Sequence, residues 1–127
     1  TKMIAALNNK QLRNVDTLAV ALSEEAIEIN ELLHTKFDLI VASSVCAFLP
    51  DYEGTLKLMK RLLKPDGLFI QWDWQQTEAD PEFGFTKAMI EAGFLNAGLS
   101  VVSITNPFSL ESEKGVMQVL MGVAKNG

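Results

Sequence analysis

Cysteine and histidine are scarce in this sequence of 127 residues, which contains one of each, Cys46 and His34. A single cysteine cannot form an internal disulfide bond, so a disulfide framework is excluded and a reducing compartment such as the cytoplasm is favoured. A lone histidine forms neither a catalytic triad nor a clustered metal site. We therefore expect no metal ligands, a solvated His34 at a helix end, and a Cys46 that acts as a small buried apolar residue.

Basic residues, long apolar runs and glycine-rich loops are also lacking. The 11 basic residues are outnumbered by 16 acidic ones, and a net charge of −5 disfavours a nucleic-acid partner. No apolar run approaches the roughly 20 residues that span a bilayer, and no basic-then-apolar leader is visible, so we expect neither a membrane partner nor a secretory signal. None of the 8 glycines forms a G-x-G-x-x-G or G-x-x-x-x-G-K-[ST] loop, which argues against those classes of nucleotide-binding domain.

The most informative segment of the sequence is a strand–helix–strand pattern between residues 37 and 72. Phe37–Ser43 is an almost continuous apolar run, typical of a strand that helices cover on both faces. Asp51 is suited to cap a helix whose apolar face repeats at Tyr52, Leu56, Met59 and Leu63. Residues 64–67 (Lys-Pro-Asp-Gly) predict a turn, and residues 68–72 a second buried strand. Such a unit builds a parallel sheet.

The flanking segments complete an α/β pattern. We predict helices at residues 1–12, from Ser23 to about His34, and at 82–97 before Gly98. We predict strands at residues 15–21, 99–105 and Gly115–Lys125, with a loop at 106–114. The last two strands leave no room for a crossover helix, so they form an antiparallel hairpin in which Gly115–Lys125 is central. No linker divides the sequence, and we expect one domain over residues 1–127.

Ligands of open α/β sheets bind beyond the carboxyl ends of the strands. Two such ends carry polar or aromatic residues, which are Ser43, Ser44, Val45 and Cys46 after the first strand and Trp72, Asp73 and Trp74 after the second. Hydroxyls and backbone amides on the first suit a polar ligand, and the aromatic pair on the second suits a flat ligand or a cation. The alternatives are plain loop polarity for the serines, a turn for Asp73, and core packing for the tryptophans.

The order of these elements resembles the second half of a class I S-adenosylmethionine-dependent methyltransferase. Residues 37–44 resemble the fourth strand of that family, and residues 49–51 with 62–67 resemble its next helix and the turn into its fifth strand. Residues 97–104 and 119–125 resemble its closing hairpin, and residues 1–6 the helix after its second strand. The resemblance covers essentially the whole chain but only the last two-thirds of the family's domain, and it implies a Rossmann-like, mostly parallel sheet truncated at its N-terminus.

The sequence departs from the family pattern in three places. The family's G-x-G-x-G loop, which contacts the cofactor, and the acidic residue that holds its ribose would both precede residue 1. The histidines that many small-molecule members carry after the fourth strand are replaced by Ala47 and Phe48. Where the family often places an aspartate near the adenine, this chain has Ser23 and Glu24, which we take as candidate cofactor contacts.

The resemblance implies a methyltransferase that uses S-adenosylmethionine, with Ser43, Ser44 and Val45 at the cofactor. A short segment at residues 75–83 favours a small-molecule acceptor, for which Trp72 and Trp74 are the candidate contacts and Asp73 the candidate proton acceptor. The alternative is a non-catalytic remnant or a dimerising interaction module that does not bind the cofactor. Without the family's first two strands, the apolar edge at Phe37–Ser43 lacks a partner, and we expect residues 15–21 or a second copy of the chain to pair with it.

Overall fold

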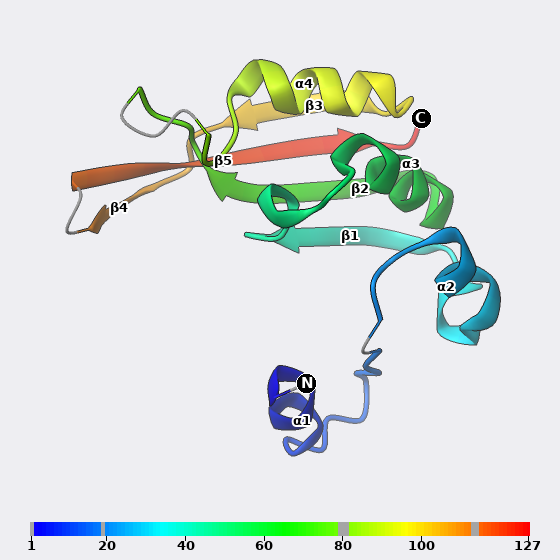
Figure 1. The fold of residues 1–127 in the computed structure, drawn as a ribbon. Helices are drawn as coiled ribbons and strands as arrows, with labels where there is room; N and C mark the ends of the chain where they lie inside the picture. The colour runs from blue at the N-terminus through cyan, green and yellow to red at the C-terminus, as the bar shows by residue number, and fades with distance from the viewer. Residues whose placement is uncertain (1, 19, 79–81, 113–114) are drawn as a thin grey trace. The chain divides into compact units, whose positions relative to one another are not determined.

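The computed structural model of the chain describes residues 2–18, 20–78, 82–112 and 115–127 (Figure 1). It divides into two compact parts, residues 1–35 and residues 36–127, which are described here separately. No helix within the described ranges is long and apolar enough to cross a membrane.

The first part contains short helices. These are α1 (Lys2–Asn8), α2 (Glu24–Ile29) and the 3-10 turn η1 (Glu31–Leu33). The predicted cap of α2 is confirmed, because the Ser23 hydroxyl accepts a hydrogen bond from the Ala26 amide and Glu24 and Glu25 occupy the first turn. The helix predicted to end near His34 ends at Ile29 instead, because Asn30 is extended; the separate turn η1 follows, and His34 is the residue after it.

Two further predictions for this part are wrong. The first helix ends at Asn8 rather than residue 12, and Gln11 has a φ of 52°, which a helix cannot continue through. Residues 15–18, 20 and 21 form no strand, and residue 19 lies outside the described residues. A strand exists only when its backbone finds a partner, so an apolar run of strand length is not sufficient.

The second part is built on a mixed sheet with the predicted α/β architecture. Its strands are β1 (Phe37–Ser43), β2 (Leu63–Trp74), β3 (Ser100–Thr105), β4 (Ser109–Ser112) and β5 (Gly115–Lys125). The order is β1-β2-β5-β3, in which β1 and β2 are parallel and β5 is antiparallel to both β2 and β3. The closing antiparallel hairpin and the central place of β5 are therefore confirmed (Figure 1).

Three boundaries in the second part differ from prediction. The strand predicted at 68–72 begins at Leu63, and residues 64–67 form an irregularity within it, where Asp66 has a φ of 63°. The region predicted as a loop at 106–114 contains β4, which pairs with the first residues of β5; residues 113–114 lie outside the described residues. The helix predicted at 82–97 is α4 (Lys87–Asn96), which begins after its cap Thr86.

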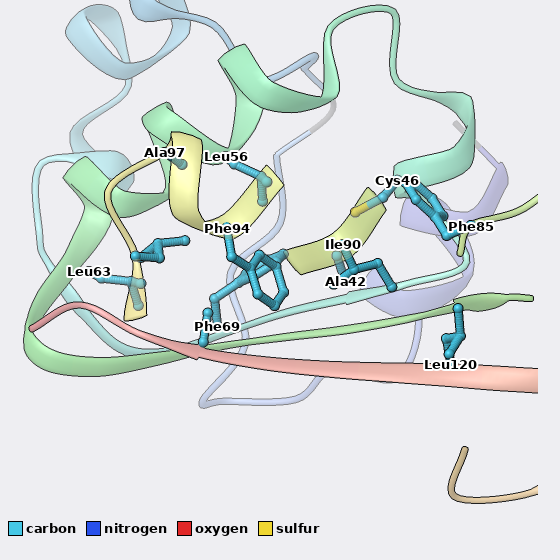
Figure 2. Close-up of a cluster of buried hydrophobic side chains, with 12 residues drawn as sticks. Ala42, Cys46, Leu56, Leu63, Phe69, Phe85, Ile90, Phe94, Ala97 and Leu120 are labelled. Atoms are coloured by element: carbon cyan, nitrogen blue, oxygen red, sulfur yellow. The ribbon is translucent and has the colours of Figure 1, made fainter. Parts of the chain in front are cut away.

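Both long helices pack on one face of the sheet. α3 (Tyr52–Leu62) and α4 enclose with the sheet a core centred on Phe69, Phe94, Ile90 and Leu120, all fully buried (Figure 2). Gly122 of β5 allows the close approach of α4, because a Cβ atom there would lie 2.8 Å from Ile90 Cγ2. Gly98 ends α4 with a φ of 84°, the left-handed cap that the sequence predicts.

The opposite face of β1 is open to solvent. Leu39 and Val41 are 50% and 48% exposed, so the prediction that helices bury this strand on both faces is wrong. Among the described residues of the second part, β1 pairs only with β2. The apolar composition of β1 is suited to burial on both faces, but α3 and α4 cover only one of them.

The cap of α3 yields a test of local stability. The Asp51 carboxylate accepts a hydrogen bond of 3.0 Å from the Gly54 amide, as the sequence predicts. We expect Asp51→Ala to lower the free energy of unfolding by ~1 kcal/mol, because one amide at the helix start loses its acceptor. Urea denaturation measures this loss as a lower midpoint at an unchanged slope. Asp51→Ser, which retains an acceptor, is the control, and an equal loss in both variants would contradict the capping role.

Candidate functional site

The carboxyl ends of β1 and β2 form the wall of a pocket of about 290 Å³. It is lined by Ser43, Ser44, Trp72, Asp73, Trp74, Phe108, Leu110 and Val119. The parallel pairing brings these ends together, since Ser43 lies opposite Trp72 in the register. Five of the predicted site residues therefore meet at one place, at the edge of the sheet where ligands of α/β folds bind.

The loop after β1 is held against β2 by its backbone. Ser44 has a φ of 57°, uncommon for a residue other than glycine, and its amide donates a 2.7 Å hydrogen bond to the Trp72 carbonyl. The chain then enters the 3-10 turn η2 (Cys46–Phe48), in which Cys46 is buried. Val45, a predicted cofactor contact, is 47% exposed and does not line this pocket.

The side chains of β2 divide between the two faces of the sheet. Trp72 and Trp74 pair with Met121 and Val119, whereas Asp73 pairs with Leu120, which belongs to the core under the helices. Because successive side chains of a strand point to opposite faces, the two indoles do not flank the Asp73 carboxylate on one face. The indoles of Trp72 and Trp74 and the carboxylate of Asp73 therefore lie on opposite faces of the sheet at the same strand end.

The Asp73 carboxylate is enclosed, since the residue is 2% exposed. It accepts a 2.8 Å hydrogen bond from Gln71 Nε2 and another from the Ala47 backbone. Burial raises the pKa of Asp73 above its usual range, and these two hydrogen bonds oppose that shift because they favour the charged form. A carboxylate with a raised pKa at a strand end is a candidate proton acceptor.

Three residues at or beside the site are not apparent from the sequence. Phe108 and Leu110 line the pocket because β4 pairs with β5. This pairing was not expected, since residues 106–114 were predicted to form a loop. Gln71 is completely buried and hydrogen-bonded to the Tyr52 hydroxyl. Its signal in the sequence is a polar residue within a run of buried apolar ones, since such a residue requires partners.

The remaining predicted residues are not in the second part of the chain. Ser23 and Glu24 belong to the first part of the chain, where the Ser23 hydroxyl serves as the cap of α2. Across the residues that the structure describes, no group of three or more histidine, cysteine, aspartate or glutamate side chains could hold a metal ion.

The lining fits one part of an S-adenosylmethionine molecule better than the whole. Hydroxyls at Ser43 and Ser44 and the aromatic side chains suit a flat ring with polar substituents. A volume of about 290 Å³ is at the small end of small-molecule pockets. The described residues therefore supply a surface for a ring or for a small acceptor, but not an enclosure for both.

Comparison with known proteins gives a consistent result. A family profile described as a methyltransferase domain matches residues 1–69. TehB from Haemophilus influenzae superposes with a TM-score of 0.68 at 19% identity, over 99% of this chain and 47% of that one. A SAM-dependent methyltransferase from Aquifex aeolicus gives 0.64 at 20% identity, over 98% and 61%. No curated protein matches the sequence.

A third structure contains ligands. The 1,6-didemethyltoxoflavin-N1-methyltransferase of Burkholderia thailandensis, solved with 1,6-didemethyltoxoflavin and S-adenosylhomocysteine, has a TM-score of 0.64 at 19% identity, over 96% of this chain and 55% of that one. At these identities the likeness establishes the Rossmann-like fold. The chain spans about half to three-fifths of the length of these structures.

Proposed function

Because the chain belongs to the methyltransferase domain family, we propose that it forms part of an enzyme that methylates a small molecule with S-adenosylmethionine. One observation carries this proposal, namely the meeting of the ends of β1 and β2 at a pocket that is lined by Ser43, Ser44, Trp72, Asp73 and Trp74. We propose further that residues 1–127 act as one partial methyltransferase domain.

The proposed roles follow the two strand ends. Ser43, Ser44 and Val45 are the proposed cofactor contacts at the end of β1. Ser23 and Glu24, in the first part of the chain, are proposed separately as cofactor contacts. Trp72 and Trp74 provide the apolar surface against which the methyl acceptor lies. When bound, S-adenosylmethionine supplies an electrophilic methyl group, and the contribution of these residues is to hold the acceptor in line with it, since orientation accounts for much of the rate in such reactions.

Asp73 is the proposed proton acceptor. An amine or hydroxyl that gains a methyl group must lose a proton, and a nearby carboxylate can take it. Burial raises the pKa of Asp73, which brings the carboxylate closer to the working pH and makes it a better base. The short segment between β2 and α4 and the pocket volume of about 290 Å³ favour a small acceptor over a macromolecule.

Titration of the 127-residue chain with S-adenosylmethionine and S-adenosylhomocysteine tests the proposal. We expect both to bind in the micromolar range by calorimetry and to shift the indole NMR signals of Trp72 and Trp74. Adenosine monophosphate, which lacks the amino-acid portion, is the control ligand and should bind more weakly. No heat and no indole shift from a folded sample would contradict cofactor binding by this chain.

A second candidate function is a dimerising interaction module without cofactor binding. The exposed Leu39 and Val41 favour it, because they lie on a strand that pairs only with β2 among the described residues. Sedimentation of the same sample distinguishes the two candidates. A dimer that gives no heat would support the module, whereas a monomer that binds S-adenosylhomocysteine would support the enzyme.

A further inference from the structure

A chain of hydrogen bonds runs from α3 to Asp73 beneath the helices. The Tyr52 hydroxyl donates to Gln71 Oε1 over 2.6 Å, and Gln71 Nε2 donates to Asp73 Oδ2 over 2.8 Å. Gln71 and Asp73 are 0% and 2% exposed, so water does not compete for these bonds. Across the described residues, no buried side-chain nitrogen or oxygen lacks a partner.

The packing around Tyr52 holds the first residue of this series of hydrogen bonds in place. Its ring lies 4.9 Å from the Phe85 ring, at an interplanar angle of 54°. Gly93 of α4 leaves the space that the ring fills, since a Cβ atom there would lie 2.7 Å from Tyr52 Cε2. The first residue of α3 and the last third of β2, which are 19 residues apart in the sequence, are thereby linked through side chains whose positions leave little freedom.

The direction of the hydrogen bonds depends on the charge of Asp73. An ionised carboxylate only accepts hydrogen bonds, so Gln71 must present its NH₂ group to Asp73 and its oxygen to Tyr52. Burial raises the pKa of Tyr52, which keeps the hydroxyl protonated and able to donate. With Asp73 ionised, Tyr52 therefore acts as a donor to Gln71, and Gln71 acts as a donor to Asp73.

Among the described residues, no neighbouring cation favours the ionised form of Asp73. The titratable groups that face it are Cys46 and Tyr52, and burial raises the pKa of both, so both are neutral at pH 7. The interactions that favour its charge are the hydrogen bonds from Gln71 and the Ala47 backbone. The bond from Gln71 thus depends on the orientation of the Gln71 side-chain amide.

We propose that Tyr52 and Gln71 are positioning residues that keep the Asp73 carboxylate ionised and in a fixed orientation at the end of β2. The inference rests on the proposed function, in which Asp73 accepts a proton from the methyl acceptor. A carboxylate has about four acceptor positions, of which two are used by Gln71 and Ala47. Asp73 is also among the residues that line the pocket at this strand end, where its remaining lone pairs would meet a substrate N–H or O–H group.

NMR titration of the Asp73 side-chain carbon in the 127-residue chain tests this proposal without a cofactor. We expect Gln71→Met, which is similar in length but cannot donate, to shift the Asp73 titration to higher pH. Tyr52→Phe should give a smaller shift in the same direction, because the Gln71 amide loses only the group that orients it. Met59→Leu on the same helix is the matched control and should leave the titration unchanged.

A measurement on the unaltered chain covers the case in which a variant does not fold. The side-chain amide signals of Gln71 should change with pH at the same midpoint as Asp73, because one amide proton is bonded to that carboxylate. Independent midpoints, or folded Gln71 and Tyr52 variants with an unchanged Asp73 titration, would overturn the proposal. These readouts need no S-adenosylmethionine, so a failed cofactor titration leaves them interpretable.

Discussion

Phe94→Ala is expected to lower the free energy of unfolding by ~3–5 kcal/mol, the usual range for removing a buried aromatic side chain. Phe94 is completely buried in α4, and its ring meets that of Phe69 edge to face at 5.9 Å. The ring also fills the space above Gly122, where a Cβ atom would lie 2.9 Å from Phe94 Cζ. Its removal opens a cavity between helix and sheet that the surrounding side chains only partly close. Urea denaturation followed by circular dichroism measures the loss.

Leu95→Ala is the matched control for Phe94→Ala. Leu95 is the next residue of the same helix and is 56% exposed, so its truncation should cost less than ~1 kcal/mol. Phe94→Leu, which removes less volume, should fall between the two. Equal losses for Phe94→Ala and Leu95→Ala would contradict the packing of α4 against β5.

Cys46 is expected to react with iodoacetamide about a thousandfold more slowly than an exposed cysteine. Burial, with a smaller contribution from the charge of Asp73, raises the pKa of the Cys46 thiol from 9.0 to about 12. Because only the thiolate is nucleophilic, a rise of about three pKa units lowers the reactive fraction near pH 7 by ~10³. The 2% exposure of the residue slows the reaction further. Mass spectrometry of timed samples measures the rate.

The neighbouring position provides the control for Cys46. Val45 is 47% exposed, so a cysteine introduced by Val45→Cys in a Cys46→Ala background should react at an ordinary rate. Cys46 itself should become reactive in guanidinium chloride, where the burial is lost. If folded Cys46 reacted within tenfold of the Val45→Cys thiol, the enclosure of the η2 turn would be contradicted.

The elements that sequence analysis located correctly are those with strong local signals. Ser23 and Asp51 cap their helices as predicted, and Phe37–Ser43 forms a strand with the predicted bounds. Capping depends on a side chain and amides three residues away, so it can be read from sequence spacing. The final strand is similarly marked by apolar residues on both faces, which indicate a central position.

The errors fall where a distant partner decides the structure. Residues 15–21 have strand composition but no strand partner among the described residues, whereas β4 has weak composition and forms because β5 lies beside it. The site shows the same division. The two strand ends were predicted, but the side on which the Asp73 carboxylate lies, relative to Trp72 and Trp74, depends on the register of β2 against β5.

The amino-acid sequence by itself determined the α/β class, the helix caps and the strand ends where a ligand would bind, because apolar periodicity and capping act over a few residues. Only the tertiary structure decided that Tyr52, Gln71 and Asp73 form a buried chain and that Leu39 and Val41 remain exposed. Those features join residues up to 21 positions apart, or depend on which face the helices cover. These features depend on sheet register and helix packing, and neither of those can be predicted from a local sequence pattern.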